Sequence, residues 1–280
     1  PAILGFDVSG IVTAVGPDVT GFAVGDAVYG AAGGVASHPG AYAEMIAADT
    51  RVIAKRPSNL SPVEAAALPL VTITAWEGLE RAGLSATQGA GQGAGQRVLV
   101  RGGTGGVGHV VIQLAKAWGA EVTASVSSDA KAATAKELGA DHIINYRTDD
   151  WDEAVAKLTD GMGFDIVFDA TGGDQLDPAF TAARLNGQVS ALVSLFTHDL
   201  SQLHARGLTL HLVFMPLNLI AGIGGKAHQR ILEGAAKLAE AGKLKPLIDA
   251  QRFTFETIPD AHRHAENGKP DGKVVIAIAD

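Results

Sequence analysis

The pattern of hydrophobic and polar positions changes near residue 97 of the chain. Before it, short apolar runs are separated by Gly and Pro turns, which is typical of a compact β-rich domain. After it, apolar runs of strand length alternate with helical patterns, which indicates repeated βαβ units. The sequence therefore predicts an α/β fold in which a doubly wound parallel sheet with right-handed crossovers accompanies a β-rich domain.

The β-rich part is expected to hold three strands before its first helix, at 9–16, 25–30 and 41–49. Ser61, Pro62 and Glu64 then form a helix start, with Ser as the cap and Glu three residues later. A helix is expected at 73–83, and 88–96, which repeats Gly-Ala-Gln, is expected to be a flexible surface loop.

The alternating part predicts strands at 97–102, 120–126, 141–146, 164–173, 187–193 and 208–214, and helices at 107–118, 131–138, 151–158, 177–185 and 226–242. The uncharged stretch 207–225 contains Thr, His, Pro and Asn, which argue against a membrane-spanning helix, so we expect a buried strand followed by a loop. The end of the chain returns to the β-rich pattern. We therefore predict one domain from 1–73 and 246–280, with the sheet domain, 74–245, inserted into it.

Composition and charge narrow the classes of function. The 280 residues, 47% of them apolar, are enough to bury two ordinary cores. The net charge of −8 is spread without a basic block, so we expect no nucleic-acid partner. The chain has no cysteine, which excludes disulfides and thiolate-bound zinc and suits a reducing cytoplasm. No signal peptide is recognised, and we expect a cytoplasmic protein.

The main chemical signal is the spacing of glycines in "RVLVRGGTGGVGHVVIQLAKAWGA", residues 97–120. Gly103, Gly105 and Gly108 satisfy G-x-G-x-x-G after a predicted strand and at the start of a predicted helix. The first glycine permits a tight turn, the second lets the backbone approach a pyrophosphate, and the third lets helix and strand pack closely. The pyrophosphate would lie at the N-terminus of the helix, where N–H groups and the dipole favour anions.

The end of the second strand distinguishes NADPH from NADH. NAD sites usually place an acid there to hold the ribose hydroxyls, whereas this strand ends in "ASVSSDAK". Ser125, Ser127 and Ser128 stand in place of the acid, and Lys131 offers a positive charge, which favours NADPH. An alternative stays open, because Ser127 or Ser128 is also a natural N-cap and Asp129 a natural first-turn residue whatever binds.

The sequence resembles the medium-chain dehydrogenase/reductases, and within them the zinc-independent quinone oxidoreductase branch that includes zeta-crystallin. The resemblance rests on segments that run in order along nearly the whole chain. They are "LGFDVSGIVTAVG", "GFAVGDAVYG", "GAYAEMIA", "AAALPLVTITAW", "RVLVRGGTGGVGHVVIQLAKAWGAEV", "ELGADHIINYR", "FDIVFDATGG" and "HRHAENGKPDGKVVIAI".

The resemblance implies a Rossmann domain that binds NADP, inserted in a GroES-like catalytic domain, with the active site in the cleft between them. It also implies a homodimer that pairs the strand from Leu208 to Phe214 with its counterpart. In this family further strands, with cleft-facing Asn, Tyr and Asp positions, precede the segment matched by residues 1–10. We therefore expect the chain to begin inside the catalytic domain, which would be incomplete at its N-terminus.

The resemblance also assigns positions around the cofactor. Thr74 faces the nicotinamide, 103–107 forms the pyrophosphate loop, and Ser127, Lys131 and Tyr146 surround the 2′-phosphate. The full set of matched positions is Thr74, Gly103, Thr104, Gly105, Gly106, Val107, Gly108, Ser127, Lys131, Tyr146, Ala170, Thr171, Gly172, Val193, Leu195, Phe214 and Met215.

A metal site is not expected. Zinc-dependent relatives carry a His-Glu pair in the segment that here reads "GFDVSG", where this chain has Phe6 and Asp7. His262 and His264 are two positions apart on a predicted helix and do not share a face. The remaining histidines, such as His198 and His204, are isolated.

The sequence thus favours hydride transfer from NADPH, with NADH a weaker alternative, to a small electrophile such as a quinone or a conjugated enone. Tyr29, Tyr42 and Thr74 are the candidate polar groups of the cleft, with Tyr29 and Thr74 the candidate catalytic residues, but no proton donor is assigned. Three alternatives stay open: an enoyl-thioester reductase of the same superfamily, a non-catalytic NADPH-binding relative and, least favoured, a zinc alcohol dehydrogenase.

Overall fold

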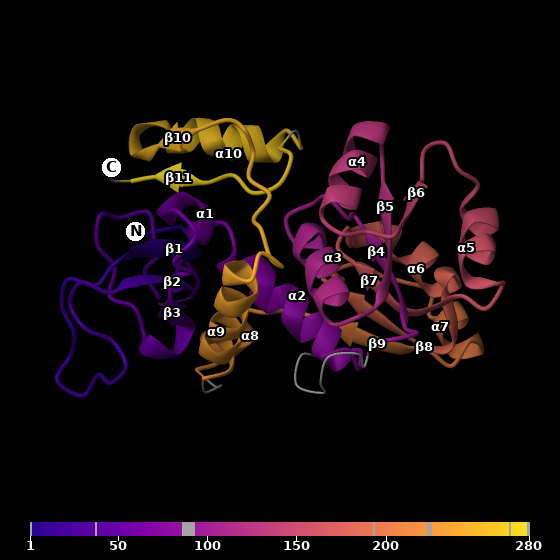
Figure 1. The fold of residues 1–280 in the computed structure, drawn as a ribbon, viewed down its shortest axis with the longest axis horizontal. Coiled ribbons are helices and arrows are strands. Elements are labelled where there is room, and N and C mark those ends of the chain that lie inside the picture. Colours follow the sequence, from indigo (N-terminus) through magenta and orange to yellow (C-terminus); the bar gives the residue numbers. More distant parts are fainter. Residues whose placement is uncertain are drawn as a thin grey trace. The chain divides into compact units, whose positions relative to one another are not determined.

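The computed structural model describes residues 2–36, 38–85, 93–192, 194–222, 226–268 and 270–278, with the backbone alone at 174 and 175. The chain forms two compact units, each described by itself below (Figure 1). Unit 1 contains Pro1–Ile73 and Met215–Asp280, and unit 2 contains Thr74–Phe214. Residues 88–92 of the predicted surface loop lie outside the described residues.

Unit 2 is built on a six-stranded, wholly parallel sheet, which confirms the predicted doubly wound fold. The strand order is β6-β5-β4-β7-β8-β9. The strands are β4 Arg97–Arg101, β5 Glu121–Val126, β6 His142–Asn145, β7 Phe164–Asp169, β8 Ala183–Ala191 and β9 Thr209–Leu212. The chain reverses its direction across the sheet between β4 and β7. Such a switch point opens a crevice at the carboxyl ends of these strands.

Helices cover both faces of this sheet (Figure 1). One face carries α3 Gly108–Ala117 and α4 Asp129–Glu137, and the other carries α5 Trp151–Thr159, α6 Asp177–Ala182 and α7 Ser201–Ala205, with the 3-10 helix η3 Gly173–Leu176 leading into α6. Val155 of α5 and Phe180 of α6 pack on Val167 of β7 in one buried cluster. Burial on both faces explains why the strands read as continuous apolar runs.

Helix α6 ends three residues earlier than predicted. The sequence extends it to Leu185, whereas the backbone is already extended at Ala183, which pairs with Phe164 as the first residue of β8. Pairing with β7 therefore overrides the helical pattern at this point.

Unit 1 holds a three-stranded antiparallel sheet of β1 Asp7–Ile11, β2 Ala27–Ala31 and β3 Ile53–Lys55, and a parallel pair of β10 Phe253–Thr254 and β11 Ile276–Ala277. Its helices are η1 Thr50–Val52, α1 Pro62–Ala66, α8 Leu217–Ile220, α9 Ala227–Glu240, η4 Phe255–Thr257 and α10 Ile258–Glu266. Helix α2, Pro69–Arg81, begins in unit 1 and continues into unit 2. The predicted capping box is confirmed, because Ser61 and Glu64 cap α1 reciprocally.

The strand predicted at 41–49 is wrong. The third strand is β3, Ile53–Lys55, and the 41–49 segment forms only isolated backbone bonds. The N–H groups of Ala41 and Tyr42 donate to the carbonyls of Gly5 and Leu4 at 2.8 and 2.9 Å. Gly5 has a φ of +91°, which breaks the extended geometry that a longer ladder would need. The loop predicted after 214 likewise contains a single helical turn, α8.

The second boundary between the units also differs from the predicted one, which the sequence places at 245/246. The units separate at 214/215 because α9 packs against β3 and η1 of unit 1. The Asn59 side chain donates to the carbonyl of Ala239 at 2.9 Å, and Ser58 donates to the Glu240 carboxylate, which fixes the end of α9 to the same unit.

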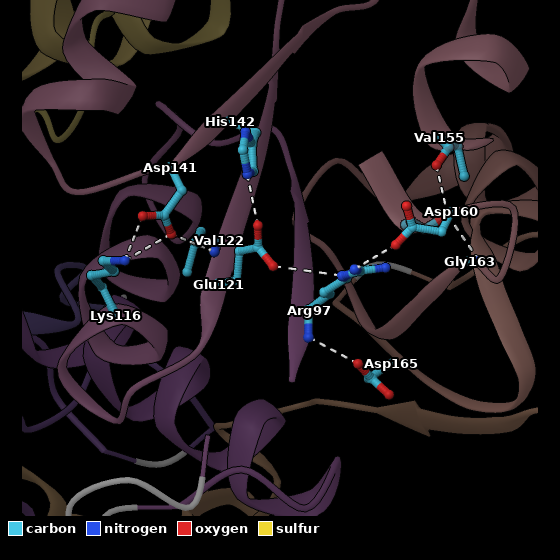
Figure 2. Close-up of polar contacts among 11 residues, drawn as sticks. Arg97, Lys116, Glu121, Val122, Asp141, His142, Val155, Asp160, Gly163 and Asp165 are labelled. Atoms are coloured by element: carbon cyan, nitrogen blue, oxygen red, sulfur yellow. Dashed lines mark hydrogen bonds and ion pairs between the residues drawn. The ribbon is translucent and has the colours of Figure 1, made fainter. Parts of the chain in front are cut away.

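The amino ends of the unit 2 strands carry a network of ion pairs (Figure 2). Arg97 pairs with Asp160 at 2.8 Å and with Glu121 at 3.5 Å, and Glu121 contacts His142 at 2.7 Å. Asp165 accepts a hydrogen bond from the backbone N–H of Arg97 at 2.8 Å. Exposed pairs of this kind contribute little stability individually. They lie at the amino edge of the sheet, opposite the carboxyl edge where the cofactor site is predicted.

Candidate functional site

The predicted dinucleotide loop lies between β4 and α3, at the switch point of the sheet. Gly102 takes a φ of +72°, and the N–H of Gly105 closes a turn onto the carbonyl of Gly102 at 3.0 Å. The N–H of Gly103 donates to the carbonyl of Ser125 on β5 at 3.2 Å. The loop is therefore anchored to the neighbouring strand before α3 begins.

The three glycines of the motif differ in what surrounds them. A Cβ on Gly108 would lie 2.1 Å from the carbonyl oxygen of Gly102, and one on Gly103 would lie 2.9 Å from the Cβ of Ala124. At exposed Gly105, a Cβ would meet only the Gly102 oxygen, at 3.2 Å. The first and third glycines thus permit the packing of the chain itself, and the second leaves the outer surface of the loop open.

The start of α3 offers hydrogen-bond donors. Within the described ranges, the N–H groups of Gly106, Val107 and Gly108 donate to no protein acceptor, and no side chain caps the helix. Orphan N–H groups and the positive end of the helix dipole together attract an anion. The donors and the exposed backbone at Gly105 fit a pyrophosphate.

The ends of β5 and β6 carry the residues predicted around a 2′-phosphate. After β5, Ser127 and Ser128 follow in place of an acid, and Ser128 caps α4 by accepting the N–H of Lys131 at 3.3 Å. The backbone of Tyr146, just after β6, donates to Val126 at 3.1 Å, and its side chain is 52% exposed. The structure thus places Ser127 and Tyr146 just after the carboxyl ends of adjacent strands, and Lys131 in the first turn of the helix that follows β5.

Two residues at this edge were missed by the sequence analysis. Asp169, the last residue of β7, is fully buried and forms an ion pair with Arg101, the last residue of β4. Its other oxygen accepts from the N–H and hydroxyl of Thr171, at 2.9 and 2.8 Å, and from the N–H of Gly172 at 2.7 Å. The sequence contains one signal that could have revealed this pair: Arg101 and Asp169 are charged residues, and each ends an apolar run shortly before a glycine turn.

The remaining predicted cofactor positions do not all belong to the same unit. Thr104 and Thr74 are buried in unit 2, Leu195 is almost fully exposed, and Phe214, the last residue of unit 2, is 56% exposed. Met215 is buried in unit 1. Val193 lies outside the described residues, and Ala170 lies beside Thr171 and Gly172 in the loop after β7.

Tyr29, a candidate catalytic residue, lies in the core of unit 1. Its side chain is fully buried on β2, and its hydroxyl donates to the carbonyl of Leu232 on α9 at 2.6 Å. Burial, together with the negative charge of Glu240, raises the pKa of Tyr29 far above its ordinary value. A hydroxyl held in this way stabilises the packing of β2 against α9. Tyr42 is half-buried, with its ring edge against His262.

In the segment that holds zinc in zinc-dependent relatives, the side chains of this chain make structural contacts. Phe6 has no donor atom, and Asp7 accepts from the N–H of Leu70 at 2.7 Å and pairs with Lys273 at 3.3 Å. Burial raises the pKa of Asp7, although Lys273 and Leu70 oppose the shift. In the described part of the chain, no three His, Cys, Asp or Glu side chains gather as a metal site would require. At positions 6 and 7, therefore, the side chains do not supply a set of zinc ligands.

None of the helices that the structure describes combines the length and the apolar character needed to cross a membrane.

Two family models match the chain. One, described as an alcohol dehydrogenase GroES-like domain, matches residues 1–58, and the other, described as a zinc-binding dehydrogenase, matches residues 106–222. The two matches fall on the β-rich start of the chain and on most of the parallel sheet.

Relatives match over almost the full length of this chain. A 2-methylene-furan-3-one reductase of Solanum lycopersicum is 36% identical over 99% of this chain and 63% of its own length. A chloroplastic NADPH-dependent alkenal/one oxidoreductase of Arabidopsis thaliana is 32% identical over 99% and 64%. The chain thus spans less than two thirds of both relatives. The crystal structure of an alcohol dehydrogenase superfamily protein from Novosphingobium aromaticivorans is 39% identical, has a TM-score of 0.91, and is matched over 100% of this chain and 83% of its own.

Proposed function

This chain belongs to the medium-chain dehydrogenase/reductase superfamily, in the branch that contains enone and quinone reductases, and on that premise we propose that it reduces a conjugated enone or a quinone with NADPH. The observation that carries the proposal is the loop between β4 and α3, where the N–H groups of 106–108 have no acceptor among the described residues and follow the exposed backbone of Gly105. The two curated relatives described above are named as reductases of substrates of this kind, which supports the choice of acceptor.

The preference for NADPH rests on the residues after β5 and β6. A carboxylate after β5 would hold a ribose hydroxyl and repel a 2′-phosphate, whereas Ser127 and Ser128 carry no charge. Lys131 in the first turn of α4 supplies a positive charge, and Tyr146 supplies a half-exposed ring and hydroxyl. Together these side chains favour the additional phosphate group of NADPH over the free hydroxyl of NADH.

The chain's own residues bind and orient the cofactor and the acceptor, and NADPH, when bound, supplies the hydride. The N–H groups of 106–108 would hold the pyrophosphate, and the loop of Ala170, Thr171 and Gly172 would line the cofactor beyond it. Thr74 and Phe214 are proposed to border the nicotinamide. Reduction of an enone adds the hydride to its β-carbon and a proton to its α-carbon, and reduction of a quinone adds a hydride and a proton to give the hydroquinone.

We also propose that the reaction needs no zinc. Phe6 and Asp7 stand where zinc-dependent relatives hold donors, and Asp7 is already engaged by Leu70 and Lys273. An enone or quinone is conjugated and electrophilic without a Lewis acid, which suits a site built only from hydrogen-bond donors. A cytoplasmic location forms part of the proposal, since a chain without cysteine suits a reducing compartment.

A homodimer is proposed through β9. This strand is one of the two edge strands of the six-stranded sheet, and Leu212 at its end and Phe214 just after it are about half exposed. An outer strand with apolar side chains is a template for pairing with a second copy. Sedimentation should give the mass of two chains, and a monomer at micromolar concentration would contradict the pairing.

A panel of acceptors tests the proposed function. The oxidation of NADPH and of NADH is followed with an alkenone, a quinone and an enoyl thioester, and bound metal is measured in the same sample. Turnover of enone or quinone by a protein without bound zinc is expected. A preference for the thioester would identify an enoyl-thioester reductase, and binding of NADPH without turnover of any acceptor would identify a non-catalytic relative.

A further inference from the structure

The ion pair of Asp169 and Arg101 lies at the carboxyl edge of the unit 2 sheet. The two residues end adjacent parallel strands and are partners in register. The Asp169 side chain has no exposed surface, and the Arg101 side chain is 11% exposed, with its guanidinium 5.7 Å from the centre of the Trp151 ring. A carboxylate without exposed surface cannot touch a ligand directly, so any role in binding must act through its neighbours.

The neighbours of Asp169 belong to the two loops that form the proposed cofactor site. One carboxylate oxygen accepts three hydrogen bonds from Thr171 and Gly172, which fold the loop after β7 back onto its own strand. The other oxygen pairs with Arg101, whose next residue is Gly102, the start of the glycine loop. One oxygen of the carboxylate therefore bonds the loop after β7 directly, and the other bonds the residue that immediately precedes the glycine loop.

The two loops also contact each other directly. The N–H of Ala170 donates to the carbonyl of Arg101 at 3.1 Å. A Cβ on Gly102 would lie 3.0 Å from the Cγ2 of Thr171, so the backbone of one loop lies against a side chain of the other. A displacement of either loop would therefore break hydrogen bonds to Asp169 or contacts with its partner.

Stability is a weak reason to keep such a pair. Desolvation of two charges offsets most of their attraction, and a well-packed apolar replacement is often neutral or stabilising. The exposed pairs at the amino edge carry no comparable desolvation cost. A buried, fully hydrogen-bonded carboxylate is well suited, however, to fixing several backbone groups in one geometry.

We propose that Asp169 is a positioning residue that holds the glycine loop and the loop 170–172 in their binding geometry before NADPH arrives. The inference rests on the proposed function and deepens it, because it names the group that preorganises the cofactor site. Preorganisation lowers the ordering cost of binding. Loss of Asp169 should therefore weaken NADPH binding and loosen both loops in the protein without cofactor.

The test compares Asp169→Asn with a matched control on the same strand. Asp165→Asn removes a carboxylate at the other end of β7, where Asp165 pairs with Arg184 at 2.7 Å and accepts from the N–H of Arg97. Two quantities are measured for each variant: the dissociation constant for NADPH by fluorescence titration, and amide hydrogen exchange of 102–108 and 170–173 without cofactor. Asp169→Asn should weaken NADPH by about tenfold and speed exchange in both loops, whereas Asp165→Asn should change neither.

A second pair of variants keeps the test decisive if Asp169→Asn fails to fold. Thr171→Val removes the hydroxyl that donates to Asp169, and Thr171→Ser retains it. Faster loop exchange in Thr171→Val that is restored in Thr171→Ser supports the positioning role. If Asp169→Asn folds and its loop exchange is unchanged, the positioning role is overturned. If Asp169→Asn does not fold, unchanged loop exchange in Thr171→Val overturns the positioning role instead. Loop exchange is measured without cofactor, so failure of the wild-type chain to bind NADPH would sink the proposed function separately.

Discussion

The carboxylate of Asp7 accepts a hydrogen bond from the N–H of Leu70 at 2.7 Å, which joins β1 to the first turn of α2. Its other oxygen lies 3.3 Å from the ammonium of Lys273, near the end of the chain. One side chain therefore ties three segments of unit 1 that are far apart in sequence. The carboxyl group of Asp7 is largely buried, with the side chain only 12% exposed.

Burial at this site makes the stability of the chain depend on pH. Because burial raises the pKa of Asp7, the folded chain holds the proton at pH values where the unfolded chain, with an ordinary value near 3.8, has lost it. The contribution of neutral Asp7 is thus complete below that value and is lost as the pH rises through the folded pKa. The free energy of unfolding of the wild type minus that of Asp7→Asn should therefore be smaller at neutral pH than at about pH 4.

Urea denaturation of both chains at the two pH values measures this difference, and subtracting Asp7→Asn removes the titration of all other groups. A difference that grows toward neutral pH would contradict the prediction. It would mean that the attraction of Lys273 outweighs the desolvation of the carboxylate.

The buried hydroxyl of Tyr29 should contribute to stability and not to turnover. Tyr29→Phe removes the buried hydrogen bond that the hydroxyl donates to the carbonyl of Leu232, which should cost about 1 kcal/mol in urea denaturation. Tyr42→Phe is the control, since within the described residues the Tyr42 hydroxyl has no hydrogen-bond partner, and it should change the stability little. A large loss of the turnover number in Tyr29→Phe, with the stability retained, would restore Tyr29 as a catalytic candidate.

The glycines of the loop should separate into two classes on substitution by alanine. Gly108→Ala would force a Cβ against the Gly102 carbonyl and should destabilise unit 2 by about 2 kcal/mol or more. Gly105→Ala meets one atom at 3.2 Å, so it should leave the melting temperature nearly unchanged while it weakens NADPH. Gly10→Ala, which has open space around its Cβ position, is the control for both measurements. Equal melting temperatures for the Gly108 and Gly105 variants would contradict the prediction. They would show that the backbone around Gly108 shifts to accept a Cβ without loss of stability.

The ammonium of Lys131 should select NADPH over NADH. Lys131→Ala removes the charge proposed to face the 2′-phosphate and should weaken NADPH by about tenfold, with NADH little affected. Lys136→Ala removes the same charge from the last turn of the same helix and should change neither constant. Titration of each variant with both cofactors gives the four constants. Equal weakening of the two cofactors by Lys131→Ala would remove Lys131 from the phosphate site.

The sequence predicts unit 2 well because local patterns and the final structure agree there. A strand such as Phe164–Asp169 is apolar because both faces of the sheet are covered, and Gly108 has its place because a helix must pack close to a strand. The spacing of residues along the chain is enough to reveal both features.

Unit 1 and the Asp169 pair depend instead on contacts between distant residues. The segment around Tyr42 alternates like a strand, but its partner bends at Gly5, and no local pattern records that bend. Helix α9 has the same amphipathic pattern whichever unit it covers, so the boundary at 214 could not be read from it. Asp169 was passed over because its partner, Arg101, is 68 residues earlier in the chain.

The transfer of deuterium tests the central claim most directly. The chain is mixed with an alkenone and with NADPH that carries deuterium at the transferable position of the nicotinamide, and the product is analysed by mass spectrometry. The proposed function predicts a saturated ketone with one deuterium on the carbon β to the carbonyl. An alkenone and a quinone that both remain unreduced while NADPH is bound, or a saturated product without deuterium, would contradict it.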